Sequence, residues 1–143
     1  QMCIRDRSQA VILAPLLEDV GVSGITVHGR TRQGAFRGTV DLAGIRAVVN
    51  SVCDIPVFGN GDVTDLASAR EMMDHTGCAG LVIGRGALVD PWIFRRLERG
   101  LSGVMSGRRH TLEEHVAFMS RHFDGLVKQR GEKLACTQFR KTF

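Results

Sequence analysis

The sequence predicts an α/β fold in which short parallel strands alternate with helices. Apolar residues at helical spacing are followed by a short β-branched run three times between residues 9 and 88. The centres of these runs, near Val27, Val57 and Val82, lie about one strand–helix unit apart. Strands at that separation are joined by helical crossovers and pair in parallel, as they do in a (β/α)8 barrel.

Each unit carries its own start and stop signals. "QAVILAPLLEDVGVSG" has helical spacing and stops at Gly21 and Gly24, and "VDLAGIRAVVNSV" repeats the amphipathic pattern. Gly77 closes a third helix, "DLASAREMMDHTG", and Pro56 stands at the start of the second strand, where proline is tolerated. The expected helices cover residues 9–21, 40–52 and 65–77, and the expected strands lie near residues 24–28, 56–59 and 80–84.

The first eight residues, "QMCIRDRS", have no clear periodicity. They resemble a translated sequencing-adaptor remnant, so residues 1–8 are expected to be non-native and are left out of the fold prediction. On this interpretation the natural upstream part of the protein is missing from the chain.

Composition is typical of a globular chain. At 143 residues and 43% hydrophobic content the chain suits one domain with a buried core. No apolar run reaches the roughly 20 residues that span a bilayer, so we expect no membrane contact and a cytoplasmic protein. The four cysteines are scattered without a CxxC pair or a histidine at ligand spacing, so we expect reduced thiols and no metal site.

The charge is unevenly distributed along the chain. Residues 95–143 carry 11 Lys or Arg against 5 Asp or Glu, whereas residues 1–94 are slightly acidic. Most of the cations are arginines, whose planar fork matches phosphate oxygens. A polyanionic partner for the basic segment and a simple solvated helical surface both explain this distribution.

Glycine-bearing sequences follow each expected strand. They are His28-Gly29-Arg30, Gly59-Asn60-Gly61-Asp62 and Gly84-Arg85-Gly86. The carboxyl ends of all strands in a parallel barrel open on the same face, where such barrels keep their active sites. The last two loops, with Asn60-Gly61 and Gly84-Arg85, are therefore expected to cradle a phosphate through backbone N–H groups and the guanidinium of Arg85.

Four stretches together resemble the bacterial tRNA-dihydrouridine synthases, nearest to their B-type branch. They are "GITVHGRTRQGAFRG", "IPVFGNGDVTD", "GLVIGRGALVDPWIFR" and, more weakly, "FRK" near the end. The order and spacing of these motifs are specific, whereas each piece alone is weak. The resemblance, from about residue 9 to the end, implies the second half of an FMN-dependent (β/α)8 TIM-type barrel over residues 9–100. It also implies a truncated small helical domain that binds tRNA.

The resemblance also implies roles for individual residues. His28 would lie beside the flavin ring, where an N–H donor stabilises negative charge on the reduced flavin. Arg30 and Arg32 would line the RNA-facing mouth or support the flavin. The remaining cofactor-binding positions are Asn60, Gly61 and Asp62, which match the family's flavin-contacting NGD, and Gly84 and Arg85 at the FMN phosphate.

The chain lacks the segment that carries the family's catalytic acid. That acid is a cysteine in the first half of the barrel, near a lysine and a glutamine that hold the flavin, and Cys53, Cys78 and Cys136 lie elsewhere. The resemblance thus implies an enzyme that reduces uridines in tRNA to dihydrouridine with NADPH as reductant, monomeric and without metal. The chain alone is expected to be inactive.

The basic segment has its own organisation. Residues 101–110 read as a Gly/Ser linker, and residues 111–143 begin the helical tRNA-binding domain. Thr111 and Glu114 have capping-box spacing at the start of a long helix. The FRK match gives Arg140 and Lys141 as RNA contacts, although Thr142 follows where the B-type branch commonly has a histidine.

Two other functions stay open. Another FMN-dependent (β/α)8 barrel oxidoreductase would share the phosphate cradle and would not need the basic segment. A non-catalytic phosphate-binding or RNA-binding module would keep the charge and lose the flavin.

Overall fold

The computed structural model describes residues 2, 3, 7–30, 39–103 and 110–142. The chain divides into two compact units, Gln1–Ala87 and Leu88–Phe143. The linker expected at residues 101–110 stays a prediction. Each unit is described by itself below.

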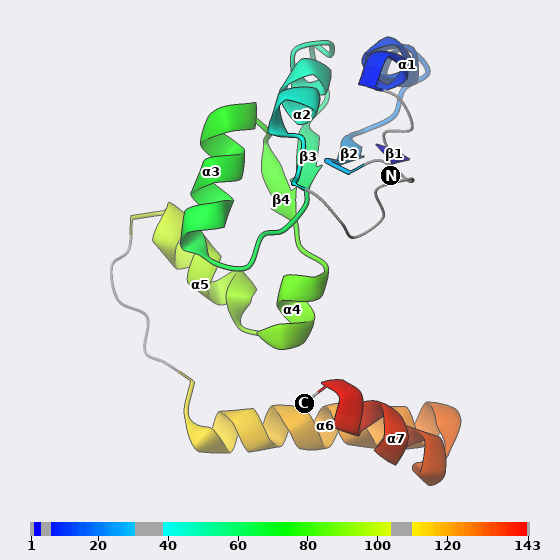
Figure 1. The fold of residues 1–143 in the computed structure, drawn as a ribbon, viewed down its shortest axis with the longest axis vertical. Helices are drawn as coiled ribbons and strands as arrows, with labels where there is room; N and C mark the ends of the chain where they lie inside the picture. Colours follow the sequence, from blue (N-terminus) through cyan, green and yellow to red (C-terminus); the bar gives the residue numbers. More distant parts are fainter. Residues whose placement is uncertain (1, 4–6, 31–38, 104–109, 143) are drawn as a thin grey trace. The chain divides into compact units, whose positions relative to one another are not determined.

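The first unit is built on a four-stranded parallel sheet in the order β1-β2-β3-β4 (Figure 1). Its strands are β1 (Met2–Cys3), β2 (Ile25–His28), β3 (Val57–Asn60) and β4 (Gly80–Val82). The parallel pairing of the three expected strands is confirmed. The structure adds β1, from the segment set aside as non-native; this two-residue pairing does not bear on the origin of that segment, which stays a prediction.

Helices α2 (Leu42–Val49) and α3 (Leu66–Thr76) pack against the sheet. Side chains alternate along the strands, so Ile25 and Val27 of β2 share one buried face with Val57 of β3. The buried apolar residues of the helices complete this core, namely Ile45 and Val48 of α2 and Ala69 and Met72 of α3. α3 approaches so closely that a Cβ at Gly59 would lie 2.6 Å from the Sδ atom of Met72.

The helix ends use the residues that the sequence marks for them. The Asp65 carboxylate accepts a hydrogen bond from the backbone N–H of Ser68 in a capping box at the start of α3. Gly77 ends α3 in the left-handed conformation, with φ of 69°. Asp41 caps α2 through the backbone N–H of Gly44. Both helices lie inside their expected ranges.

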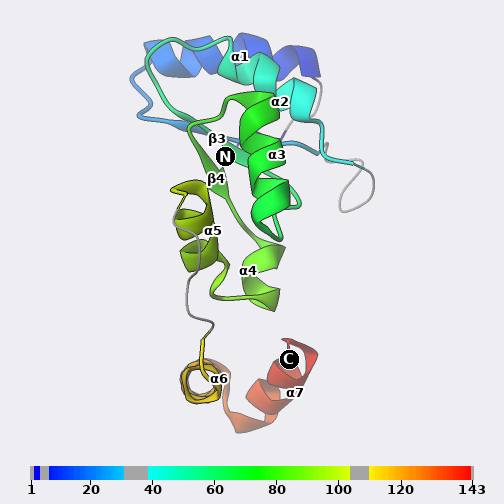
Figure 2. The same ribbon diagram turned by 90° about the vertical axis from the view of Figure 1, so that its left-hand side faces the viewer.

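Helix α1 (Arg7–Asp19) is connected to the loop before β3 by hydrogen bonds to one carboxylate. Glu18 accepts hydrogen bonds from the backbone N–H groups of Cys53, Asp54 and Ile55 at 2.6 to 3.1 Å. These bonds, first of all the one from Asp54, lower the pKa of Glu18 below its ordinary value of 4.5. The α1 helix is thereby held beside α2, as Figure 2 shows.

The chain leaves β4 two residues earlier than expected and turns into two short helices, α4 (Arg85–Val89) and α5 (Ile93–Leu101). The turn begins at Gly84, whose carbonyl accepts a hydrogen bond from the N–H of Ala87 at 3.0 Å. Within the second unit, α5 starts beyond a turn in which the Asp90 carboxylate accepts a hydrogen bond from the Trp92 N–H.

The second unit ends in a hairpin of α6 (Leu112–Arg130) and α7 (Glu132–Thr142), which lie side by side in Figures 1 and 2. The expected capping box is present, because the Thr111 hydroxyl accepts from the Glu114 N–H and the Glu114 carboxylate accepts from the Thr111 N–H. Ala135 of α7 is fully buried. The prediction of a mostly helical stretch after residue 110 is confirmed.

Candidate functional site

The candidate site lies at the carboxyl edge of the parallel sheet. His28, Asn60 and Val82 end their strands at matching positions, because His28 pairs with Asn60 and Asn60 pairs with Val82. In-register residues of parallel strands face the same side, so His28 and Asn60 share a face opposite to the one that α2 and α3 cover. The loops that follow these strands are therefore brought together, as the sequence predicts.

The loop after β3 has an uncommon backbone. Gly61 has φ of 150° and Asp62 has φ of 48°, a region that few residues other than glycine adopt and that aspartate tolerates better than most. A Cβ at Gly61 would lie 2.7 Å from Cγ2 of Val40, so only glycine fits there without a shift. This turn carries the Asp62 carboxylate to the edge of the sheet.

Asp62 joins two guanidinium groups that come from the two neighbouring strand ends. Arg30, after β2, donates from Nη1 to Oδ1 of Asp62 at 2.8 Å and makes a second, very short contact from Nη2 to Oδ2. Arg85, after β4, donates from Nη2 to the same Oδ1 at 2.8 Å. These three residues are called the Arg–Asp–Arg cluster below.

The members of the Arg–Asp–Arg cluster differ in exposure. The Arg30 side chain is 12% exposed, whereas those of Asp62 and Arg85 are 45% and 57% exposed. The hydrogen bonds and positive charge of Arg30, with a smaller contribution from Arg85, lower the pKa of Asp62 below its ordinary value of 3.8. The carboxylate is therefore ionised at neutral pH, and the three side chains together carry one net positive charge.

The space beside Arg85 suits a ligand. A Cβ at Gly84 would have nothing within 4 Å, so the backbone there is open to an approaching group. An exposed guanidinium next to open backbone can bind an anion such as phosphate, which accepts two parallel hydrogen bonds from arginine.

The other expected site residues belong to the second unit or fall outside the described residues. Arg32 falls in residues 31–38, which are outside them. Arg140 is an exposed residue of α7 in the second unit, and Lys141 lies in the same helix with its side chain outside the described part. Cys53 and Cys78 lie on the connections that enter β3 and β4, at the opposite ends of the strands from the cluster.

The part of the chain that the structure describes contains neither a group of metal-ligating side chains nor a membrane-spanning helix. Among residues 2, 3, 7–30, 39–103 and 110–142, no three His, Cys, Asp or Glu side chains are grouped so that they could hold a metal ion. None of the helices in these ranges is both long enough and apolar enough to cross a membrane.

Sequence reasoning missed how the cluster is connected. It assigned Arg30 to the RNA-facing mouth or to flavin support, and it assigned Asp62 and Arg85 separately to the flavin. The available signal was the occurrence of one charged residue two to three positions after each of three parallel strands, with alternating sign in the order of the strands.

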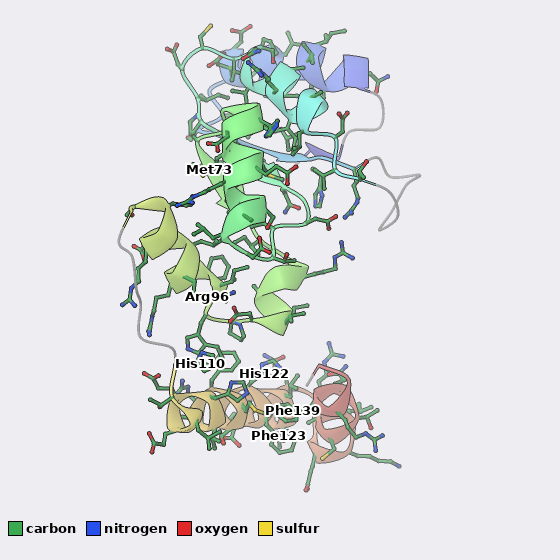
Figure 3. All side chains as sticks on the ribbon, turned by 60° about the vertical axis from the view of Figure 1, so that its left-hand side comes forward. Met73, Arg96, His110, His122, Phe123 and Phe139 are labelled. Atoms are coloured by element: carbon green, nitrogen blue, oxygen red, sulfur yellow. The ribbon has the colours of Figure 1, made fainter. Side chains whose placement is uncertain are left out.

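Sequence reasoning also missed a run of stacked rings in the second unit. The rings of Trp92 and His110 lie 3.9 Å apart and almost parallel, and His115 stacks on Trp92 at 5.3 Å. His122 lies between Phe118 of α6 and Phe139 of α7. Figure 3 shows His122, Phe123 and Phe139 gathered where the two helices meet. The His122 ring thus contacts rings of both α6 and α7.

Comparison with known proteins gives a consistent result. The whole chain, residues 1–143, matches the dihydrouridine synthase (Dus) family. It is 35% identical to a probable tRNA-dihydrouridine synthase of Rhodobacter capsulatus, over 95% of the chain and 42% of that protein. It is 45% identical to tRNA-dihydrouridine synthase B of Serratia marcescens over 67% of the chain and 28% of that protein. It is 47% identical to tRNA-dihydrouridine synthase B of Escherichia coli K12 over 62% of the chain and 27% of that protein.

The resemblance drawn from HGRTR, NGD and GRGA is thus confirmed over nearly the whole chain, including the similarity to proteins named as the B type. The chain spans less than half the length of these relatives. Because the family match covers the whole chain, the chain belongs to the dihydrouridine synthase family.

Proposed function

We propose that this chain is part of an FMN-dependent enzyme that reduces uridines in tRNA to dihydrouridine. The proposal is supported most by one observation, the Arg–Asp–Arg cluster at the carboxyl edge of a parallel sheet in a chain of the dihydrouridine synthase family. The names of the relatives, which are tRNA-dihydrouridine synthases, support an oxidoreductase that acts on tRNA.

The described residues fit the phosphate end of a flavin mononucleotide. Arg85 offers an exposed guanidinium, and Gly84 leaves open space beside it. A phosphate in this place would receive charge-assisted hydrogen bonds from Arg85. Gly61 lets the loop after β3 pack closely against Val40. Asn60, Asp62 and Gly84 complete the proposed cofactor-binding set; Asp62 is exposed and Gly84 borders open space, whereas Asn60 is buried at the end of β3.

The sheet itself is consistent with part of a (β/α)8 barrel. Its parallel strands are covered by α2 and α3 on one face, and His28 and Asn60 lie on the other, which would be the barrel interior. His28 would hold the flavin ring through a ring N–H that donates to developing negative charge. The general acid would come from a cysteine in a segment outside this chain.

FMN supplies the hydride for the uracil ring when it is bound, and NADPH is the proposed reductant. The residues of this chain would bind and orient the cofactor and the tRNA. Arg85 would hold the FMN phosphate, and the α6–α7 hairpin is the proposed contact for tRNA. The hairpin carries Lys128, Arg130, Lys133 and Arg140, all exposed, so it can neutralise RNA phosphates. We further propose a monomer that works where tRNA is found, in the cytoplasm.

The proposal is tested with a full-length protein that contains this chain. The purified protein should retain FMN, identified by its absorbance and mass after gel filtration. With NADPH it should form dihydrouridine in tRNA isolated from cells that lack this modification, measured by mass spectrometry of the nucleosides. Substitution of NADPH by NADH in the same assay tests the reductant.

The same experiment separates the two remaining functions. A protein that retains FMN but leaves tRNA unmodified, with all uridines intact, would be another flavin-dependent barrel oxidoreductase. A protein that binds tRNA without retaining any flavin would be a phosphate-binding or RNA-binding module. Either result would contradict the proposed activity.

A further inference from the structure

Arg30 and Arg85 compete for one carboxylate. Both donate to Oδ1 of Asp62, each at 2.8 Å, and Arg30 also contacts Oδ2. A bidentate pairing of arginine with carboxylate is stronger and more directional than a single hydrogen bond. Arg30 therefore makes the firmer pairing with Asp62, and Arg85 makes the weaker one.

The burial of the three side chains gives this competition a direction. The Arg30 side chain is 12% exposed, whereas the Arg85 side chain is 57% exposed. A largely buried guanidinium needs its counter-charge more than an exposed one, because water compensates the exposed group. The arrangement is thus asymmetric, with a largely buried arginine fixed on the carboxylate and an exposed arginine that a ligand can reach.

We propose that Arg30 is a positioning residue for the cofactor phosphate, because by occupying Asp62 it limits how firmly Asp62 holds Arg85. This inference rests on the proposed function, in which Arg85 binds the phosphate of FMN. Arg30 does not touch the phosphate; it acts through the shared carboxylate. It follows that removal of Arg30 leaves Asp62 to pair with Arg85, which lowers the net charge of the cluster from one to zero and withdraws Arg85 from the ligand.

The test compares FMN with riboflavin, which lacks the phosphate, in a full-length protein that contains this chain. The measured quantity is the ratio of the two affinities, obtained from flavin fluorescence quenching after removal of the bound cofactor. Arg30→Met should lower this ratio by about tenfold, which corresponds to about 1.4 kcal/mol, and leave the riboflavin affinity unchanged. Arg46→Met, at an exposed position of α2, removes the same charge elsewhere and should leave the ratio as it was.

A second variant distinguishes positioning from direct contact. In Arg30→Met with Asp62→Asn the competing carboxylate charge is absent, so Arg85 is released and the ratio should return to that of the unsubstituted protein. If the double variant stays as weak as Arg30→Met, Arg30 contacts the phosphate itself and the inference is wrong. Arg30→Lys keeps the positive charge but cannot make the bidentate pairing. It should lower the ratio of the two affinities less than Arg30→Met does, and it provides a readout if Arg30→Met does not fold.

The outcomes also separate this inference from the proposed function. An unsubstituted protein that binds FMN no better than riboflavin would contradict the phosphate site and with it the proposed cofactor role. If the unsubstituted protein prefers FMN and the Arg30→Met variant has the same ratio of FMN affinity to riboflavin affinity, only the role of Arg30 is contradicted.

Discussion

Asp62 combines an uncommon backbone conformation with two ionic contacts. Its φ of 48° costs conformational energy for a residue with a side chain, and the pairing with Arg30 and Arg85 offsets that cost. Local strain of this kind is retained where the surrounding contacts determine the geometry, which is common at binding sites. The aspartate therefore lies where the proposed cofactor site and the uncommon backbone of the loop after β3 coincide.

Arg85 is the residue whose removal should affect cofactor binding most directly. In the full-length protein, Arg85→Ala should weaken FMN binding by about 2 kcal/mol, the size expected for loss of a charged hydrogen-bond partner. Riboflavin binding should change little, because riboflavin has no phosphate. The measurement is flavin affinity by fluorescence, with Arg46→Ala as the control of equal charge. An FMN affinity equal to that of the control would remove Arg85 from the phosphate site.

Glu18 should contribute pH-dependent stability. Its pKa is lowered by three backbone N–H donors, so its contribution to stability is fully present above the ordinary value of 4.5. That contribution is lost as the pH falls through the lower pKa of the folded state. Glu18→Gln should therefore lower the melting temperature at pH 7, and the difference from the unsubstituted protein should shrink as the pH falls below about 4.5.

The control for Glu18 is Glu71→Gln, which removes the same charge from an exposed position of α3. Thermal unfolding of both variants in the full-length protein, followed by circular dichroism between pH 3 and pH 7, gives the comparison. A melting temperature for Glu18→Gln that matches the Glu71→Gln value at every pH would show that the contact between α1 and the loop at residues 53–55 does not stabilise the protein.

At the scale of elements, the α6–α7 hairpin depends on ring packing between two half-buried phenylalanines. Phe123 and Phe139 meet edge to face, with centroids 5.3 Å apart and an interplanar angle of 70°. The ring pair should contribute about 0.5–1.5 kcal/mol beyond its buried area. Phe123→Leu and Phe139→Leu, singly and together, form the double-mutant cycle that measures this coupling.

The coupling is measured in the full-length protein by native-state hydrogen exchange of backbone amides in α6 and α7, which reports the opening of this hairpin. A matched double-mutant cycle pairs Phe123 with Leu134, a residue of α7 that is 57% exposed, and should give no coupling energy. Purely additive losses at Phe123 and Phe139 would contradict a specific ring contact between the helices.

At the scale of the whole molecule, the flavin residues and the basic hairpin belong to different compact units. The two proposed functions can therefore be altered separately. In the full-length protein, Arg140→Ala with Lys141→Ala should leave FMN binding unchanged and weaken tRNA binding. The log–log dependence of tRNA affinity on salt should flatten by about one for each phosphate contact that is lost.

The control for this pair is Glu113→Ala, an exposed acidic residue in the first turn of α6, which should not weaken tRNA binding. Binding is measured by filter retention over a range of salt concentrations. A double variant with the tRNA affinity and the salt dependence of the unsubstituted protein would assign Arg140 and Lys141 to a solvated helical surface, the alternative that charge alone left open.

The sequence by itself determined the features that depend on neighbours a few residues away. Helical spacing, the Asp65 and Thr111 caps and the Gly77 end each involve contacts within one or two turns, so the local pattern contains the whole cause. The parallel arrangement followed from the separation of the strands, because only a helical crossover fits between them. The family could also be identified from the sequence, because the motifs that indicate it are short and contiguous.

The tertiary structure alone decided which side chains meet. Arg30 and Asp62 are separated by 32 positions in the chain and Asp62 and Arg85 by 23, and the register of the three strands brings them within hydrogen-bond distance. The same is true of Glu18 and residues 53–55, and of Phe123 and Phe139. Such contacts depend on the exact alignment of strands and helices in space. In the sheet, a one-residue change of register would turn the side chains of a strand to the other face and displace the loop that follows it.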